Sequence, residues 1–296
     1  MPNTTSPVVV GIDGSERSIA AARWAAAVAE EYDTSLLLVH STATAGHFIS
    51  DAAVIAIRAA AAADQRGAAE KTVTMAKDTI AGEFPGLTVD ADIVEEPAGK
   101  ALVRLSRDAE FVVVSSDDVN PVAALLVGST TMHVASHAVC PVVAWRNTVQ
   151  PNTDQVVVGV DGTAAGTAAL AAAFEYAHNF GAPLVAVHSW STRLPADEVT
   201  IPYLIDWDAL EAAEWALLTH ALEPWTAKYP DVAVTTLLDD AKPSRSLLDR
   251  LSGAQMVVVG NHRSNALSAA LIGSTSLNLL HHSSVPVMIC HAEPMT

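Results

Sequence analysis

The sequence predicts two consecutive α/β domains, each built on a parallel sheet with helices on both faces. First, the segment Val8–Ser15 recurs as Val156–Thr163, displaced by 148 residues (156 − 8). Second, apolar runs that suit buried strands alternate with helical segments along both halves. Third, the matching segments follow the same order in each half. Alternation of strand and helix with right-handed crossovers then gives a five-stranded parallel sheet per half.

Each half opens with a β-branched apolar run that stops at glycine, aspartate, glycine and a hydroxyl residue. The apolar run is typical of a strand buried on both faces. Asp-Gly-Ser or Asp-Gly-Thr before alanine-rich sequence predicts a turn and a helix start, capped by the hydroxyl or the carboxylate. Asp13 and Asp161 therefore follow the carboxyl ends of strands, which is where ligands bind in open α/β sheets.

The remaining elements of the first half follow from composition and period. Trp24 and Val28 lie four residues apart in a helix-favouring stretch, and the alanine-rich segment that follows the second strand ends before Gly82 and Pro85. Strands are predicted at Ser35–His40, Leu87–Val94, Phe111–Val114 and Pro141–Trp145, helices at Ser18–Tyr32, Asp51–Ile80, Pro97–Asp108 and Thr130–Ala138, and loops at Thr42–Ile49 and Ser115–Pro121.

The second half repeats this order with one change in spacing. Leu184–Ser189 matches Leu36–Ser41 at 148 residues, whereas Met256–Val259 matches Phe111–Val114 at 145. A net deletion of three residues (148 − 145) therefore lies between the second and fourth strands. The polar segment Asn147–Asp154 is predicted to link the domains, which we place at residues 1–148 and 149–296.

Composition excludes several classes of function. The net charge is −17, and no Lys/Arg cluster offers a footprint for nucleic acid or an anionic membrane. No apolar run approaches the roughly 20 residues of a membrane helix, and the polar start Met1–Pro7 lacks signal-peptide features. Cys140 and Cys290 lie far apart in apolar runs, as core residues of a reduced protein do. We therefore expect a cytoplasmic protein.

Three features that recur in order carry a resemblance to a known family. They are Val-Gly-Ile-Asp-Gly-Ser, the strand ending in Val-His-Ser, and the late Val-Val-Val-Gly followed by Gly-Ser-Thr. Both halves resemble universal stress protein domains. The whole chain, including Glu223-Pro-Trp and Tyr229-Pro-Asp-Val, resembles the tandem form found in actinobacteria. The resemblance implies two Rossmann-like (HUP-type) domains with strand order 3-2-1-4-5, pairing through the last strand, and a homo-oligomer, a dimer.

Some members of that family bind ATP and others do not. The binders resemble one another in a pattern of Gly, two residues, Gly, nine residues, then Gly-Ser or Gly-Thr. Such glycines let backbone N–H groups approach phosphates, and the final Gly-Ser opens a helix whose N-terminus favours anions. The first aspartate would face the sugar, because a carboxylate repels phosphate but accepts hydrogen bonds from ribose hydroxyls.

The second half keeps most of this pattern. Gly260 fills the first position, Arg263 stands at the second, and nine residues lead to Gly273-Ser274. If that backbone needs positive φ, arginine costs roughly 1–2 kcal/mol there, which pairing of its guanidinium with phosphate could offset. The preferred site for ATP, with or without Mg²⁺, comprises Asp161, Ser189, Gly260, Arg263, Gly273, Ser274 and Thr275.

The first half has lost both early glycines. Ser115 and Asp118 replace them, with Asp117 alongside, although Gly128-Ser129 survives. A carboxylate ~4 Å from a phosphate charge costs about 1 kcal/mol in water and ~4 kcal/mol at an effective dielectric of 20. A triphosphate here would need a divalent metal to bridge the charges. The corresponding candidate site in this half comprises Asp13, Ser41, Gly128, Ser129 and Thr130.

The other polar clusters point to structure rather than chemistry. His133 and His137 lie four apart but without a third ligand, so we interpret them as surface residues. His40 and His188 end the second strands and are interpreted as structural histidines. No nucleophile elbow and no phosphate-binding loop with its lysine is present, so the sequence shows no catalyst.

The leading hypothesis is a stress-response protein that binds or senses an adenine nucleotide, mainly through the second half. Binding would shift the protein between conformational or assembly states by its differential affinity for them. The alternative is a nucleotide-free interaction or scaffold module in which both clefts are vestigial. A slow ATPase is a third possibility that the resemblance permits. Co-purified nucleotide separates the first two, and turnover above an enzyme-free blank identifies the third.

Overall fold

The computed structural model describes residues 6–43, 52–116, 128–146, 150–190, 206–261 and 272–292, without side chains at 52–63 and 65. It forms two compact units. Unit 1 holds the described residues up to Arg146, and unit 2 holds those from 150 onward. The boundary that we predict lies among residues 147–149, outside the described part, so the limits 1–148 and 149–296 stay a prediction.

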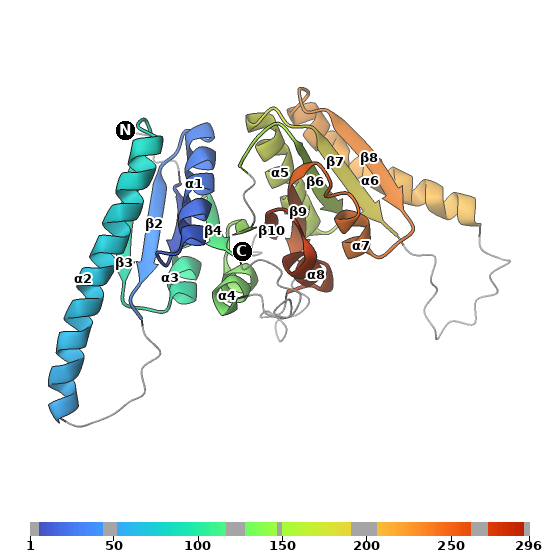
Figure 1. Ribbon diagram of the computed structural model, residues 1–296. Coiled ribbons are helices and arrows are strands. Elements are labelled where there is room, and N and C mark those ends of the chain that lie inside the picture. Colours follow the sequence, from blue (N-terminus) through green and yellow to red (C-terminus); the bar gives the residue numbers. More distant parts are fainter. Residues whose placement is uncertain are drawn as a thin grey trace. The chain divides into compact units, whose positions relative to one another are not determined.

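Unit 1 is a parallel sheet in the order β3-β2-β1-β4-β5. Its elements are β1 (Val8–Ile12), α1 (Glu16–Glu31), β2 (Leu36–Ser41), α2 (Ala52–Glu83), β3 (Val89–Val94), α3 (Ala98–Leu105), β4 (Phe111–Ser115), α4 (Ser129–His137) and β5 (Val142–Trp145). Helices α1 and α2 pack on one face of the sheet, and α3 and α4 pack together on the other (Figure 1).

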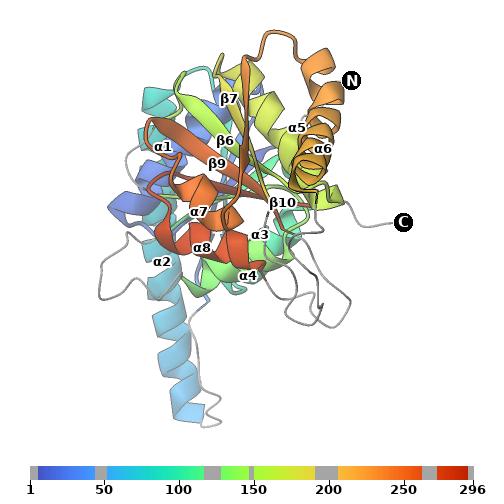
Figure 2. The same cartoon turned by 90° about the vertical axis from the view of Figure 1, so that its right-hand side faces the viewer.

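Unit 2 repeats this plan in the order β8-β7-β6-β9-β10, again all parallel. Its elements are β6 (Gln155–Val160), α5 (Ala164–Asn179), β7 (Leu184–Ser189), α6 (Trp207–Lys228), β8 (Val234–Asp239), α7 (Pro243–Leu248), β9 (Ala254–Asn261), α8 (Ser274–His282) and β10 (Val287–His291). Figure 2 shows α7 and α8 side by side on one face, with α5 and α6 on the other. The predicted fold class is confirmed.

The core of each unit is the central strand with its neighbours. The central segments Val8–Val10 and Val156–Val158 are fully or almost fully buried. The same holds for Val112–Val114 and Met256–Val259 in the strands that pair with them. Helices cover both faces, so these strands read as continuous apolar runs rather than alternating ones. Each buried valine contributes about 1.5–3 kcal/mol of hydrophobic stabilisation. Cys140 and Cys290 are both buried in the core, as expected.

The element ends differ from expectation in a few places. Helix α2 continues through Gly82 to Glu83, and the Phe84 amide still donates to Ile80 O over 2.8 Å. Pro85 therefore limits the helix, because the residue before proline is disfavoured in the α region. Ser115, predicted to begin a loop, is the last residue of β4. Most of the loops predicted at 42–49 and 115–121 lies outside the described residues.

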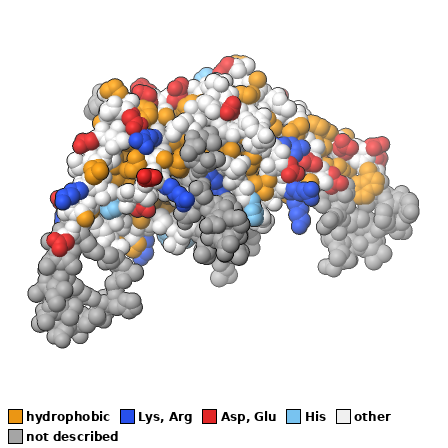
Figure 3. Space-filling model, in the orientation of Figure 1, with side chains coloured by type: hydrophobic (Ala, Val, Ile, Leu, Met, Phe, Trp, Pro, Cys, Tyr) orange, Lys and Arg blue, Asp and Glu red, His pale blue; other side chains and the backbone are white. Residues whose placement is uncertain are grey.

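Charged side chains are interspersed on the face drawn in Figure 3, where the described Lys and Arg residues form no continuous patch. Several ion pairs are solvent-exposed, and in one of them Arg23 Nε lies 2.9 Å from Glu83 Oε2. Exposed pairs of this kind contribute about 0–1 kcal/mol each. Among the described residues, no helix has the length and apolar character needed to cross a membrane.

Helices α1 and α5 end in the same hydrogen-bonded motif. In unit 2, Ala182 N donates to Ala177 O (2.8 Å), and Gly181 takes the left-handed conformation with φ +59°. In unit 1, Thr34 N makes the equivalent bond, but the left-handed residue is Asp33 with φ +49°. This conformation costs a residue with a side chain about 1–2 kcal/mol, so glycine is favoured here.

Asp33→Gly should therefore stabilise unit 1. We expect a net gain of about 0.5–1 kcal/mol, because the greater freedom of glycine in the unfolded chain offsets part of the strain relieved. Removing a carboxylate from a helix C-terminus adds to the gain. Urea unfolding measures the change, and the matched reverse variant Gly181→Asp should lose about as much in unit 2. Equal stability of Asp33→Gly and wild type would contradict the prediction.

Candidate functional site

A pocket lies at the carboxyl ends of the strands in each unit, where the strand order reverses. In unit 2 it lies at the ends of β6 and β9, and in unit 1 at the ends of β1 and β4. Their volumes are about 220 Å³ and about 280 Å³ respectively, so size does not favour unit 2. Ligands bind at this edge in open α/β sheets. Any difference between the two pockets in ligand binding must therefore come from the groups that line them.

Asp161 shapes the turn between β6 and α5. Its Oδ1 accepts hydrogen bonds from Thr163 N (2.9 Å) and Thr163 Oγ1 (2.7 Å), across Gly162 at φ +71°. Thr163 Oγ1 in turn accepts from Gly166 N (3.0 Å) and caps the helix. An aspartate that bonds the amide two residues on is typical of turns. One carboxylate oxygen thus has a structural role before any ligand is considered.

Gly166 gives this carboxylate its space, because a Cβ there would overlap Asp161 Oδ1. Unit 1 has Ser18 at the corresponding position, 148 residues earlier, and its hydroxyl accepts from Asp13 N (3.3 Å). Burial alone would raise the pKa of Asp13, but hydrogen bonds from Ser15 and Ser18 outweigh it and lower the pKa. Asp13 and Asp161 therefore each accept a hydrogen bond within the same kind of turn, but the residues around them differ.

Gly260, near the end of β9, lies against the first turn of α5. A Cβ on Gly260 would approach Ala165 C and O at 2.5 and 2.6 Å and Gly166 N at 2.7 Å. These are backbone atoms, which cannot move aside as a flexible side chain can. The glycine is therefore required by helix packing, whether or not a phosphate ever approaches it.

The N-terminus of α8 forms another part of the wall of the unit 2 pocket. Its N-cap is Gly273, which has no side chain to accept from the first helical amides. Asn261 Oδ1 accepts from Gly273 N (2.8 Å) and so ties this end of the helix to β9. The Asn261 side chain is fully buried, and its Nδ2 has no hydrogen-bond partner among the described residues. The open amides of Ser274 and Thr275 form a cradle suited to an anion.

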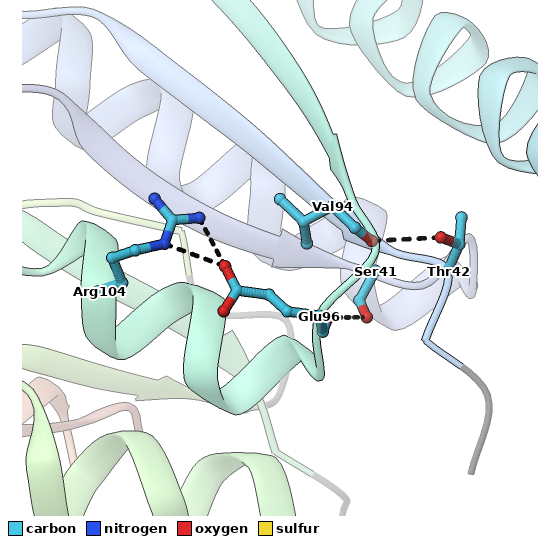
Figure 4. A network of polar contacts seen from close by, with 5 residues as sticks. All are labelled: Ser41, Thr42, Val94, Glu96 and Arg104. Atoms are coloured by element: carbon cyan, nitrogen blue, oxygen red, sulfur yellow. Dashed lines mark hydrogen bonds and ion pairs between the residues drawn. The ribbon is translucent and has the colours of Figure 1, made fainter. Parts of the chain in front are cut away.

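Unit 1 uses the equivalent groups differently. Gly128 is again an N-cap without a side chain, but Ser116, the counterpart of Asn261, accepts from Arg146 Nη2 (3.1 Å). Ser41 donates to Glu96 O (2.7 Å), as Figure 4 shows. The Glu96 carboxylate in turn accepts from Arg104 Nε and Nη2 at 3.0 and 2.7 Å. The Ser41 hydroxyl is thus committed within the fold.

The structure brings most of the predicted site residues together. Those that line the unit 2 pocket are Asp161, Ser189, Gly260, Gly273, Ser274 and Thr275. Those that line the unit 1 pocket are Asp13, Gly128, Ser129 and Thr130, and Ser41 is not among its lining residues. Arg263, Asp117 and Asp118 lie outside the described residues. The ligand roles of all these residues stay predictions.

Part of the unit 2 pocket could not be predicted from the sequence. Pro243 and Leu247 on α7, with Val187 and Val259 from the strands, add an apolar wall. In the sequence, Leu247 matches Leu102 of the first half at an offset of 145 residues. This match indicates a pocket residue only once the structure shows that both leucines line pockets. Asn261 directly follows Gly260 in the sequence. Its position does not predict that its side chain accepts a hydrogen bond from Gly273, twelve residues later.

The fold and these pockets define a class of protein, the tandem α/β proteins with a pocket at the switch point of each sheet. Within that class, residues 4–146 and 152–291 each match the universal stress protein family. The two matches cover nearly the whole chain. The chain therefore belongs to the universal stress protein family, as the resemblance predicted.

Relatives of full length agree with this assignment. A universal stress protein of Mycolicibacterium smegmatis is 33% identical over 292 residues, covering 95% of this chain and 96% of the relative. A universal stress protein of Mycobacterium tuberculosis is 31% identical over 305 residues, covering 97% and 98%. The crystal structure of a universal stress protein from Archaeoglobus fulgidus has a TM-score of 0.71 at 16% identity, covers 98% of each chain, and shows a similar fold.

Gly260→Ala should destabilise unit 2 by about 1–3 kcal/mol, the range for an overpacked core site. The added methyl group meets helix backbone at 2.5–2.7 Å, so α5 must shift. Gly159→Ala is the matched control, because its nearest atoms are side-chain methyls at 3.4 Å. Urea unfolding should show Gly159→Ala at or slightly above wild-type stability. If both variants match the wild type, the close packing inferred here is wrong.

Proposed function

We propose that unit 2 binds an adenine nucleotide, ATP with or without Mg²⁺, and that binding signals stress by shifting the protein between conformational or assembly states. The observation that carries this proposal is the convergence of Asp161, Ser189 and the α8 N-terminus on one pocket at the switch point of the sheet. A ligand can bias such an equilibrium only by its differential affinity for the states.

The α8 end of the pocket suits the phosphates. Gly273, Ser274 and Thr275 line the pocket, and the first amides of the helix carry no side-chain cap. The partial positive charge of a helix N-terminus stabilises an anion by about 0.3–1 kcal/mol at an exposed site and up to ~2 kcal/mol when partly buried. We assign the phosphates to this cradle, assisted by Arg263.

The β6–β7 end suits the sugar, and the apolar wall suits the base. Asp161 Oδ1 is used within its turn, which leaves Oδ2 as the acceptor that we assign to a ribose hydroxyl. Ser189 lines the same end of the pocket. Leu247 and Val187 offer apolar contact to a base, and such walls with a few polar groups are typical of cofactor sites.

We propose that unit 1 does not bind ATP. Its pocket is no smaller, but Ser41 is committed to Glu96, and Ser116 is engaged with Arg146 instead of holding the α4 N-terminus. Asp117 and Asp118 add two carboxylates to the segment that precedes α4 in the sequence. Like charge near a triphosphate opposes binding.

A nucleotide-free interaction module is the second candidate, and one observation favours it. Gly260 and Asp161 both have structural roles that need no ligand, so these residues alone do not require a functional nucleotide site. Under this alternative both clefts are vestigial, and function lies in the surfaces of a cytoplasmic homo-oligomer. A slow ATPase would differ from both by turnover above an enzyme-free blank.

Asp161→Asn should weaken ATP binding about tenfold, the equivalent of one hydrogen bond to a charged group. Asparagine can still accept from Thr163 through Oδ1, which preserves the turn, but it presents a donor where the carboxylate had its second acceptor. Asp13→Asn is the matched control in unit 1 and should leave affinity unchanged. Isothermal titration of the full chain measures both. Equal losses, or a loss only in Asp13→Asn, would refute the assignment to unit 2.

Arg263→Gly tests whether this arginine aids or obstructs the phosphates. It restores the glycine of the family pattern but removes a positive charge in a protein of net charge −17. We expect affinity for ATP to fall by about 1–3 kcal/mol, with a smaller loss at high salt. Titration at low and high salt measures this. Tighter binding by the variant would show that the steric cost of arginine dominates.

A further inference from the structure

His188, the fifth residue of β7, makes two short hydrogen bonds in the interior of unit 2. Its Nδ1 lies 2.7 Å from Val160 O, and its Nε2 lies 2.7 Å from Glu214 Oε2 on α6. The His188 side chain is 8% exposed and the Glu214 side chain 25% exposed. The imidazole therefore connects three elements, β6, β7 and α6.

These two contacts require a proton that a neutral imidazole and an ionised carboxylate do not have. A backbone carbonyl only accepts, so Nδ1 must carry a hydrogen. A neutral imidazole would then present a lone pair on Nε2 to the carboxylate, and the two acceptors would repel each other. Either Nε2 is also protonated or the carboxyl group is, so the pair shares one additional proton.

The pair is joined to the proposed site on both sides. His188 lies between Val187 and Ser189, which both line the pocket, and Val160 directly precedes Asp161. The bond from Nδ1 to Val160 O links the ends of β6 and β7, next to Asp161 and Ser189. The spacing of these two residues therefore depends on where the imidazole is held.

Unit 1 has the equivalent histidine, but alanine stands at the position that corresponds to Glu214. His40 Nδ1 lies 2.9 Å from Ile12 O, which is the same link between strand ends. Thr72 faces Gly14 as Leu217 faces Gly162, so α2 and α6 correspond at 145 residues (217 − 72). Glu214 then corresponds to Ala69, a buried alanine. Among the described residues, the carboxylate that would share a proton with this histidine is thus found in unit 2 and not at the matching position of unit 1.

We propose that His188 and Glu214 hold one shared proton, that this pair positions Asp161 and Ser189 for the nucleotide, and that loss of the proton at high pH weakens binding. This inference rests on the proposed function of unit 2, whose regulation it describes. Deprotonation turns the Nε2–carboxylate contact from attractive to repulsive. Glu214 and helix α6 are then released from the strand ends that carry the site.

Other described charged groups nearby do not substitute for Glu214. Asp239 of β8, next to Ser189 in the sheet, is paired with Arg250 Nη1 at 3.1 Å. Asp161 Oδ1 is bonded within its own turn. Glu211, almost one turn earlier on α6, is exposed. Glu214 is the carboxylate that contacts the ring, so it is the residue to change.

Glu214→Gln tests the role of the shared proton separately from that of the contact between His188 and α6. A glutamine amide can donate to a neutral Nε2, so this variant keeps the link to α6 without an additional proton. ATP affinity is measured on the full chain from about pH 6 to about pH 9, a range that spans the ordinary titration of histidine. We expect wild type to lose about tenfold, the equivalent of one charge-assisted hydrogen bond. Glu214→Gln should lose less than about twofold.

Glu211→Gln is the matched control and should follow wild type, while Glu214→Ala should bind weakly at every pH. ATP and the other histidines titrate in all variants, so the difference between variants is the result. Equal pH dependence of wild type and Glu214→Gln would overturn the proposal, as would rescue of Glu214→Ala affinity at high pH.

A second readout needs no nucleotide and separates this proposal from the proposed function. In uniformly ¹⁵N-labelled protein, with the His188 signals assigned by comparison with His188→Gln among 11 histidines, the His188 Nε2 signal should change as pH rises in wild type and stay fixed in Glu214→Gln. The amides of Ser189 and Thr163 should shift as pH rises in wild type and stay fixed in Glu214→Gln. Identical responses of Nε2 and of these amides to pH in both proteins would refute the pair. Failure of wild type to bind ATP at any pH refutes the proposed function instead.

Discussion

The site of unit 2 depends on the close approach of Gly260 to the first turn of α5. No Cβ fits between this residue and the backbone of Ala165 and Gly166, so β9 and the start of α5 are held in direct contact. Gly166 in turn leaves the space that Asp161 Oδ1 occupies. These two glycines thus leave the space in which hydrogen bonds from Thr163 hold the Asp161 carboxylate. Close packing explains these glycines before any ligand does.

The two units share one fold, but their equivalent polar side chains have different hydrogen-bond partners. In unit 2, Asn261 holds the α8 N-terminus and Glu214 holds His188. In unit 1, the counterparts of those two side chains are Ser116, which is engaged with Arg146, and Ala69. A helix N-terminus and a strand-end aspartate are present in both, so they do not distinguish the units. The supporting hydrogen bonds do, because a binding site needs its groups held in place before the ligand arrives.

Most of the fold could be predicted from the sequence, because the repeat reports the strand and helix order twice. The positions of Asp161, Gly260 and Gly273 at one pocket could also be predicted, since parallel strands end at the same edge. The bond between Asn261 and Gly273, the commitment of Ser41 to Glu96 and the pairing of His188 with Glu214 could not. Each joins residues 12 or more positions apart and depends on side-chain directions that periodicity does not report.

The central claim is that one chain offers one adenine-nucleotide site, in unit 2. Native mass spectrometry of the intact protein during an ATP titration tests this most directly, because it counts the nucleotides bound to each chain. The account predicts that the bound number rises to one ATP per chain and stops there. Saturation at two per chain would show that unit 1 is competent as well. No bound nucleotide at saturating ATP would show that both clefts are vestigial, and either result would contradict the account.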